Sequence, residues 1–230
     1  MPFMGTFHGI AVRILRQEAD ALGLDRNFVI YDTDDQVALI RRIMKDLKMT
    51  DSKNLKPKSV QSIISGEKNQ GKGPDDYAAS AYYPNQQKIA KIFVAYEQEK
   101  EKAGALDFDD LLLKELELFQ KHKEVREKWR TRFRHILIDE YQDTNHMQYL
   151  LTSLLAGGYE NICVVGDDDQ SIYRFRGADI DNILNFEKQY AGTRTIRLEQ
   201  NYRSTGHILN AANAFIRNNK GRKGKILWTD

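Results

Sequence analysis

The first half of the chain carries apolar side chains at the three-and-four spacing of amphipathic helices. This spacing predicts a helix over residues 6–22, a second over 34–48 with acidic residues in its first turn, and a third over 85–103. The intervening residues 50–87 are polar and hold three of the four prolines. Such a composition favours short helices and a long surface loop.

The second half changes to short apolar runs of strand type separated by helical segments. The runs are HILID at 135–139, NICVVGD at 161–167 and TIRLEQ at 195–200, and helical patterns lie between them at 144–155 and 179–190. This alternation predicts an α/β fold, a parallel sheet with helices on its faces. The residues from about 20 to 104 then form a helical insertion between pieces of that α/β layer.

Polar side chains follow each of the three apolar runs, at 139–140, 167–170 and 199–203. In parallel sheets, ligands bind beyond the carboxyl ends of the strands. A strand that ends in Asp-Glu suits a nucleotide site, because the Asp can hold Mg²⁺ and the Glu can polarise the attacking water. The alternative is that two acids begin a loop or cap a helix, but three polar clusters in one sheet favour a functional site.

A second pair of acids, Asp107 and Asp110, begins an apolar helical stripe, and we interpret both first as residues that start a helix. The single cysteine, Cys163, lies in an apolar run and reads as a reduced core residue of a cytoplasmic protein, which excludes a disulfide framework. No apolar run approaches the roughly 20 residues of a membrane span, and no signal-peptide pattern is present.

The net charge of +2 says little about partners, but basic residues cluster at 130–135, 173–177 and 217–225. These clusters could meet phosphates. A solvated basic surface is an equal alternative for the first and last of them. It is less favoured for 173–177, where aromatic residues alternate with arginines.

A nucleotide site also needs a loop that holds phosphates, of the form G-x-x-x-x-G-K-[ST]. The nearest match is GEKNQGKG at 66–73. It has glycine in place of the hydroxyl residue, the preceding VQSIIS has helical rather than strand spacing, and Pro74 follows where a helix should open. We therefore expect a flexible surface loop at 66–73 and no phosphate loop in this chain.

Several longer strings resemble, in order and spacing, successive motifs of superfamily 1 DNA helicases of the UvrD/Rep/PcrA group. The resemblance covers nearly the whole chain, and DEYQDTN and GDDDQSIYRFRGA are its most specific parts. The strings are TFHGIAVRILR (6–16), ALDFDDLL (105–112), ILIDEYQDTN (136–145), VVGDDDQSIYRFRGAD (164–179) and LEQNYRST (198–205).

The resemblance implies roles for four residues in a site for ATP and Mg²⁺. Asp139 would coordinate Mg²⁺, and Glu140 would activate the attacking water. Gln170 would sense the γ-phosphate and couple it to bound DNA. Arg203 would touch the γ-phosphate, with a structural salt bridge as the alternative for that residue.

The resemblance also implies contacts with single-stranded DNA. Tyr173 and Phe175 would stack on bases with Arg176 nearby, while Thr6 and His8 would help contact the strand. Aromatic side chains at alternate positions of an extended segment point the same way, and stacking is worth roughly 1–3 kcal/mol per base. The alternatives are ordinary core aromatics at 173 and 175, and a hydrogen bond at a helix start for His8. The family usually has Trp where this chain has Phe175.

By resemblance the chain is a segment of a helicase. Residues 1–19 would begin a RecA-like motor domain, 20–104 would be its inserted helical subdomain, 105–203 would complete what is present of the motor, and 204–230 would provide the first helix of a second motor domain. The adenine-reading motif and the phosphate loop would precede TFHG, and later motifs would follow residue 230.

The expected function is that of an ATP-dependent DNA helicase that translocates 3′ to 5′ on single strands. Its partners would be single-stranded DNA, duplex junctions and repair or replication proteins. Two other functions remain open: a non-catalytic module for single-strand binding or partner docking, and the motor of a helicase-nuclease of the RecB or AddA type. The isolated chain is expected to have little or no ATPase activity.

Overall fold

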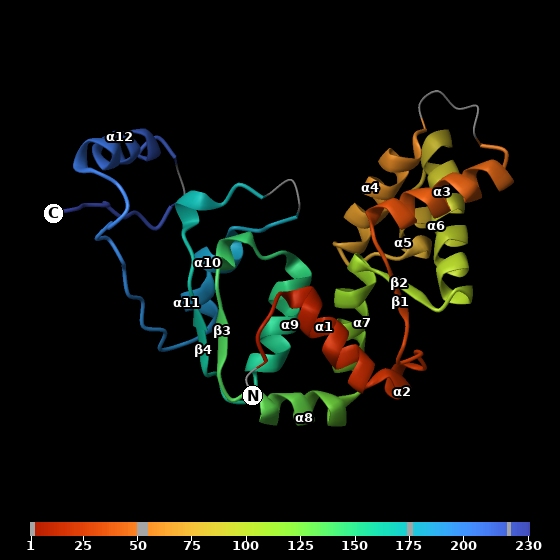
Figure 1. Cartoon of the computed structure of the whole chain (residues 1–230), viewed down its shortest axis with the longest axis horizontal. Helices are drawn as coiled ribbons and strands as arrows, with labels where there is room; N and C mark the ends of the chain where they lie inside the picture. The colour runs from red at the N-terminus through yellow and green to blue at the C-terminus, as the bar shows by residue number, and fades with distance from the viewer. Residues whose placement is uncertain (1–2, 50–54, 174–176, 220–221) are drawn as a thin grey trace. The chain divides into compact units, whose positions relative to one another are not determined.

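The computed structural model describes residues 3–49, 55–173, 177–219 and 222–230. The chain folds into two compact units (Figure 1). The first unit combines residues 1–134 with 146–159, and the second combines 135–145 with 160–230.

The first unit is mostly helical. The helices predicted over 34–48, 85–103 and 144–155 are confirmed, with ends that differ by a few residues. The helix predicted over 6–22 is present but interrupted, because α1 ends at Gln17 and α2 begins at Ala19. The described helices of this unit are α1 (Phe7–Gln17), α2 (Ala19–Leu22), α3 (Thr33–Asp46), α4 (Pro57–Lys68), α5 (Pro74–Ala79), α6 (Pro84–Lys102), α7 (Phe108–Lys121), α8 (Lys123–Arg132) and α9 (His146–Ala156).

Two short strands of the first unit were missed by the sequence pattern. Strand β1 (Val29–Tyr31) pairs in parallel with β2 (Ala105–Asp107), and Ile30 lies opposite Leu106. Three residues are too few to show the period of a strand. The pairing places the residues just before helices α3–α6 beside the residues just after them.

Two separate apolar clusters fill the first unit. One gathers α1, α7, α8 and α9 around the fully buried Trp129 and Phe119. The other gathers α3, α4 and α6 around Ile92 and Phe93, and all of its buried members fall between residues 39 and 96. The division into domains at residues 19, 104 and 203 stays a prediction.

A buried ionic cluster joins the helical segment to the start of α7. Lys68 and Lys100 are only 3% and 1% exposed. The Lys68 ammonium donates to Asp107 at 2.7 Å and to Asp110 at 2.5 Å, and the Lys100 ammonium donates to Asp107 at 2.8 Å and also to Asp110. The Tyr96 hydroxyl donates to Asp107 at 2.9 Å. Helices α4 and α6 are thereby tied to one point of the chain.

The two aspartates of this cluster also start α7, as expected. The Asp107 carboxylate accepts the Asp110 N–H, and the Asp110 carboxylate accepts the Asp107 N–H, each at 2.9 Å. Burial disfavours the charged form of Asp107, but the charges of Lys68 and Lys100 outweigh burial and hold the pKa of this carboxyl well below its usual range. The neighbouring carboxylates likewise raise the pKa of Lys68 against the effect of its burial.

The expectation of a surface loop at 66–73 is wrong for residues 66–68, which continue α4, whereas residues 69–73 do form a turn at the surface. Helix α4 continues to Lys68, whose ammonium is buried among carboxylates, and a short helix does open at Pro74 with Gly73 as its N-cap. Proline suits the first turn of a helix because its missing N–H would have no partner there. The segment still lacks the preceding strand that a phosphate loop requires, since VQSIIS is helical as predicted.

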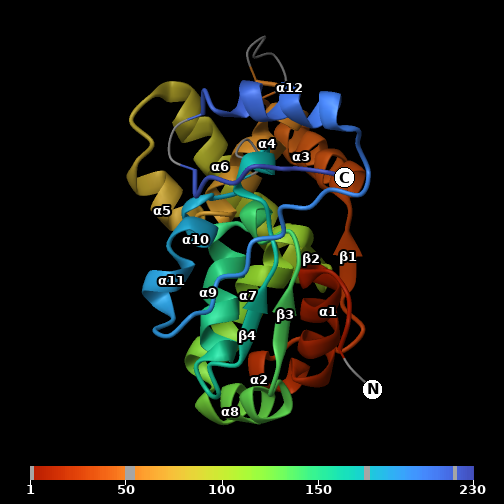
Figure 2. The ribbon, with the colours of Figure 1, turned by 90° about the vertical axis from the view of Figure 1, so that its left-hand side faces the viewer.

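The second unit contains a parallel strand pair. Strands β3 (Ile136–Ile138) and β4 (Ile162–Val164) run side by side in parallel, with Leu137 opposite Cys163 (Figure 2). This confirms the α/β class and two of the predicted strands. The remaining elements are the 3-10 helices η1 (Tyr141–Asp143) and η2 (Asp168–Gln170) and the helices α10 (Asp181–Leu184), α11 (Phe186–Gln189) and α12 (Gly206–Ile216).

Two expectations for the second unit are wrong. The TIRLEQ run forms no strand, and only Gln200 makes an isolated parallel bridge, to Trp228. Cys163 is not a core residue but exposed. It shares the uncovered face of the strand pair with Leu137, which is 77% exposed. Among the described helices of the whole chain, none combines the length and apolar character that a membrane span needs.

Replacement of Asp107 by Asn should lower the free energy of unfolding by about 3–5 kcal/mol, because the buried lysines lose the carboxylate that both of them contact. Asp110 and the less buried Glu97, which pairs with Lys68 at 3.2 Å and with Lys100 at 3.0 Å, would remain as their counter-charges. The matched control is Asp32→Asn. Asp32 caps α3 through the same reciprocal pair, with Asp35, but on the surface. Since Asn caps helices about as well as Asp, the control should change stability by under about 0.5 kcal/mol. Urea unfolding compares them, and equal losses would contradict a stabilising ionic cluster.

Glu115 on α7 gives a pH-dependent prediction. It is 3% exposed, and burial raises the pKa of its carboxyl to about 8. The unfolded chain releases this proton near pH 4.5 whereas the folded chain keeps it, so stability falls as the pH rises from about 4.5 to 8. Glu115→Gln should therefore stabilise the protein by roughly 2–5 kcal/mol at pH 8.5 and leave it unchanged at pH 4.

The control for this experiment lies on the same helix. Glu117 is partly exposed and pairs with Lys114 at 2.8 Å and Lys121 at 2.7 Å. Glu117→Gln should cost up to about 1 kcal/mol and give no gain at high pH. Thermal unfolding between pH 4 and 9 measures both variants, and a pH-independent effect of Glu115→Gln would rule out a proton retained on folding.

Candidate functional site

The carboxyl ends of β3 and β4 meet at one edge of the strand pair, as the sequence predicted. Pairing continues past the strands, since the Val165 N–H donates to the Ile138 carbonyl at 2.8 Å and the Tyr141 N–H donates to the Val165 carbonyl at 3.0 Å. The polar clusters 139–140 and 167–170 therefore start from adjacent points. Both lie within the second unit.

Gln142 connects the two clusters directly. Its side-chain amide donates to the Glu140 carboxylate at 2.7 Å, and its amide oxygen accepts the Asp167 N–H at 3.0 Å. Gln142 is 1% exposed. The side chain thus fixes Glu140 relative to the end of β4. Sequence reasoning missed Gln142, although its place two residues after Glu140, next to a strand end, was a signal that it could reach a neighbouring strand.

Gly166 makes this close approach possible. A Cβ atom at this position would lie 2.5 Å from the Gln142 side-chain oxygen and 2.8 Å from the Ile183 methyl group. Glu140 itself has a φ of 50°, in the left-handed region. A residue other than glycine there is typically strained by about 1–3 kcal/mol, and such strain concentrates at functional sites.

Asp139 has the exposure and chemistry that a magnesium ligand needs. One carboxylate oxygen accepts the Glu140 N–H at 2.9 Å, and the side chain is otherwise open to solvent. Mg²⁺ is commonly held by one or two carboxylates together with water and phosphate oxygens, so a single exposed carboxylate fits such an ion. Asp143, four residues after Asp139, is a different case, because burial and the negative charge of Glu140 raise the pKa of its carboxyl.

The second cluster is held by the basic C-terminal segment. Arg222 makes two parallel hydrogen bonds to Asp169, at 2.7 and 2.5 Å, and Lys225 forms an ion pair with Asp167. The Lys223 N–H donates to Asp168 at 2.7 Å. The three carboxylates lie close enough together to hold a metal ion. Because cations of the chain already pair with them, we assign no metal to this cluster.

Gln170 and Arg203 differ in how they are held. The Gln170 amide donates to the Asp167 carboxylate at 2.7 Å, so it faces its own cluster. Arg203 is exposed, and its backbone N–H donates to the Asn201 side chain at 2.9 Å. The structural salt bridge considered for Arg203 is not formed with any residue that the structure describes.

The predicted stacking residues are only partly placed. Tyr173 is 38% exposed, which argues against an ordinary core aromatic at this position. Phe175 and Arg176 lie outside the described residues. Their contribution to a base-stacking surface stays a prediction.

Thr6 and His8 lie in the first unit, at the start of α1. The Thr6 hydroxyl accepts the Gly9 N–H at 3.1 Å, so Thr6 rather than His8 makes the hydrogen bond of the helix start. The His8 ring meets the Phe108 ring edge to face at 5.8 Å. Burial lowers the pKa of His8 and so favours the uncharged imidazole, which can donate one hydrogen bond and accept another.

The basic cluster at 130–135 serves the first unit internally. Arg130 pairs with Glu127 at 2.8 Å and donates to the Leu154 carbonyl at 2.6 Å. The Arg132 guanidinium lies over the rings of Phe3 and Trp129. These contacts favour a structural role over phosphate binding for both arginines.

Comparison with known proteins adds an independent finding. The profile of the UvrD/REP helicase N-terminal domain matches residues 2–191. The chain is 49% identical to the ATP-dependent DNA helicase PcrA of Staphylococcus aureus strain Mu50 over 227 residues, 99% of this chain and 31% of that protein. It is 48% identical to the PcrA of Staphylococcus epidermidis strain RP62A over the same shares. The chain spans about a third of the length of these curated relatives.

The role of Gly166 can be tested by Gly166→Ala, which should cost about 1–3 kcal/mol in the free energy of unfolding because the added methyl displaces Gln142. Gly206→Ala is the control, since a Cβ atom there meets no atom within 4 Å. Adding Gln142→Ala to Gly166→Ala should give a non-additive loss, with a coupling of about 0.5 kcal/mol or more. Strict additivity would show that the two side chains do not compete for space.

Proposed function

The chain belongs to the UvrD/REP helicase family, and from that membership we propose that it is a segment of an ATP-dependent DNA helicase. The observation that carries the proposal is the Gln142 bridge, which holds Glu140 beside the end of β4. A water-activating carboxylate and a segment that senses the nucleotide must keep a fixed spacing if hydrolysis is to drive movement.

In this proposal the first polar cluster carries the hydrolytic chemistry. Asp139 would hold Mg²⁺, which when bound neutralises negative charge on the nucleotide phosphates. Glu140 would accept a proton from the attacking water, and Gln142 would keep its carboxylate aimed. Gln170 and Arg203 would contact the γ-phosphate, and the exposure of Arg203 supports its availability for that contact.

The 230 residues contain no G-x-x-x-x-G-K-[ST] segment. The lysine and hydroxyl that hold nucleotide phosphates and the metal in such loops must then come from elsewhere in a complete motor. We therefore propose that the isolated chain has little or no ATPase activity, and that Glu140 is catalytic in the longer protein.

The DNA contacts proposed for the chain come from both units. Tyr173 offers a partly exposed ring for stacking, and Phe175 and Arg176 would extend that surface. Thr6 and the neutral His8 would contact the strand as hydrogen-bonding groups. Movement from 3′ to 5′, unwinding of duplex junctions, cooperation with repair or replication proteins and a cytoplasmic location complete the proposal by resemblance to the family.

Two other functions are kept as alternatives. A non-catalytic module for single-strand binding or partner docking would retain the DNA surface without turnover, even in the longer protein. The motor of a helicase-nuclease would show turnover together with a nuclease motif downstream in the reading frame. The exposed Asp139 and the strained Glu140 backbone favour a motor, because a simple binding module has no need of them.

The decisive experiment compares DNA-stimulated ATP hydrolysis by the 230-residue chain and by the polypeptide of the complete reading frame. The longer protein should hydrolyse ATP, and Glu140→Gln should reduce its turnover by about 10²-fold or more because the general base is lost. Its affinity for single-stranded DNA should be unchanged by Glu140→Gln. The 230-residue chain should show no turnover.

Each component of the proposal can fail separately. Robust turnover by the 230-residue chain that Glu140→Gln abolishes would overturn its assigned inactivity. No turnover by the longer protein, with single-strand binding that Tyr173→Ala weakens, would favour the binding module. Unaltered turnover in the Glu140→Gln protein would remove Glu140 from catalysis.

A further inference from the structure

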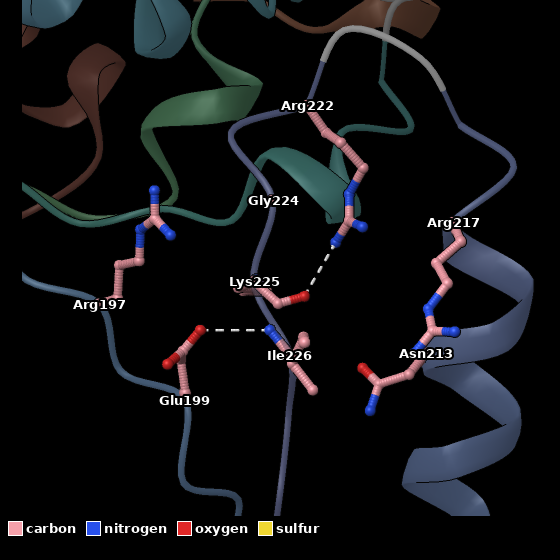
Figure 3. Close-up of a pocket in the computed structure, with 8 residues that line it drawn as sticks. All are labelled: Arg197, Glu199, Asn213, Arg217, Arg222, Gly224, Lys225 and Ile226. Carbon is pink, nitrogen blue, oxygen red and sulfur yellow. Dashed lines mark hydrogen bonds between the residues drawn. The ribbon is translucent and has the colours of Figure 1, made fainter.

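A basic groove of about 380 Å³ lies beside the C-terminal segment of the second unit (Figure 3). None of its lining residues is proposed to contact the nucleotide or to stack on bases, although Glu199 belongs to the polar cluster 199–203 and Arg222 and Lys225 pair with the second cluster. Its lining includes Arg197 from the extended segment before residue 200, Arg217 from the end of α12, and Arg222 and Lys225 from the C-terminal segment. Glu199 is its one acidic side chain.

The walls of the groove are held in place by hydrogen bonds on both sides of the C-terminal segment. On one side the Trp228 N–H donates to the Glu199 carbonyl at 3.0 Å. On the other, the Asn213 side chain donates to the Leu227 carbonyl at 2.8 Å and accepts the Leu227 N–H at 3.2 Å. In Figure 3 the segment runs between the chain that carries Arg197 and helix α12. The basic side chains are thus mounted on a connected frame.

Two of the four basic side chains in the groove form ion pairs with described residues, and two do not. Arg222 and Lys225 pair with Asp169 and Asp167. Arg197 and Arg217 form no ion pair with any residue that the structure describes. One Arg197 nitrogen donates to the Lys223 carbonyl at 3.4 Å, and the charge of Arg197 helps to lower the pKa of the Glu187 carboxyl. Both guanidinium groups keep further N–H donors that could meet an outside anion.

The one acidic side chain among the groove's lining residues is hydrogen-bonded to the backbone and keeps its negative charge. The Glu199 carboxylate accepts the Ile226 N–H at 3.2 Å and thus points toward the C-terminal segment (Figure 3). Gly224 has a φ of 70°, and a Cβ atom there would meet nothing within 4 Å. The backbone at Gly224 is therefore open to a ligand that approaches closely.

We propose that this groove binds a phosphate-ester anion. Guanidinium groups form forked hydrogen bonds that match phosphate oxygens, and two unpaired arginines suit a group or chain with more than one negative charge. None of the residues that line the groove is aromatic, so a nucleotide base would find no ring on which to stack. This composition favours the sugar-phosphate backbone of a nucleic-acid strand over a nucleotide.

The inference that the bound phosphates belong to a DNA strand rests on the proposed function. The inference that the groove binds an anion does not rest on it, and the next consequence concerns the groove when it holds DNA. It would give the second unit a contact with DNA backbone that is independent of base stacking at Tyr173. Such a contact carries no sequence information and makes affinity depend on salt.

The test uses the 230-residue chain and the double variant Arg197→Gln/Arg217→Gln, with a fluorescein-labelled oligothymidylate measured by anisotropy from 0.05 to 0.3 M salt. Loss of two phosphate contacts should weaken binding by about tenfold at 0.2 M salt and reduce the slope of log K against log[salt] by about 1.4. The control, Lys188→Gln/Arg194→Gln, removes two charges from exposed side chains outside the groove. It should change affinity by less than about twofold, since scattered charges act only through screened solvent.

A second probe, sodium tripolyphosphate measured by calorimetry, separates the two sources of phosphate. The chain could bind tripolyphosphate through Arg197 and Arg217 but fail to bind the oligonucleotide. That result would support the anion site and would contradict the proposal that its ligand is a DNA strand. Equal effects of the two double variants, or no binding of either probe by the unmodified chain, would overturn the site. These outcomes are independent of ATP turnover and of Glu140, by which the proposed function is judged.

Discussion

Two lysines and two aspartates, almost wholly removed from water, join three helices of the first unit. Lys68 lies at the end of α4, Lys100 is in the last turn of α6, and both meet the aspartates that start α7. Burial of each charge alone would be strongly unfavourable, so these groups depend on one another and on Glu97, which pairs with both lysines. The cluster therefore lies where the ends of α4 and α6 meet the start of α7.

The second unit uses uncharged polar groups for a similar purpose. Gln142 lies between the ends of β3 and β4 and is almost fully buried, and Gly166 leaves the space it needs. The link keeps the two polar clusters at a fixed spacing, which a preorganised site requires. The basic C-terminal segment adds a second link, through Arg222 and Asp169.

Features set by local sequence were predictable, and features set by distant contacts were not. The Asp107–Asp110 helix start, the strands β3 and β4 and the family itself followed from short strings of residues, and the family is confirmed by the profile match. The partners of Lys68 lie about 40 residues away, so no local pattern revealed them. TIRLEQ has the alternation of a strand, but a strand also needs a neighbour, and there it finds only an isolated bridge. The roles of Asp139, Glu140, Gln170 and Arg203 remain predictions that the geometry makes chemically reasonable.

The exposure of Cys163 has a practical consequence. It is the only cysteine of the chain, and it lies at the centre of β4, a few residues before the acidic cluster. A maleimide dye or spin label would therefore attach at one defined position without any engineered substitution. A label at that position would report on the environment of the strand pair when nucleotide or DNA is added. The unmodified sequence can therefore be used directly for spectroscopy.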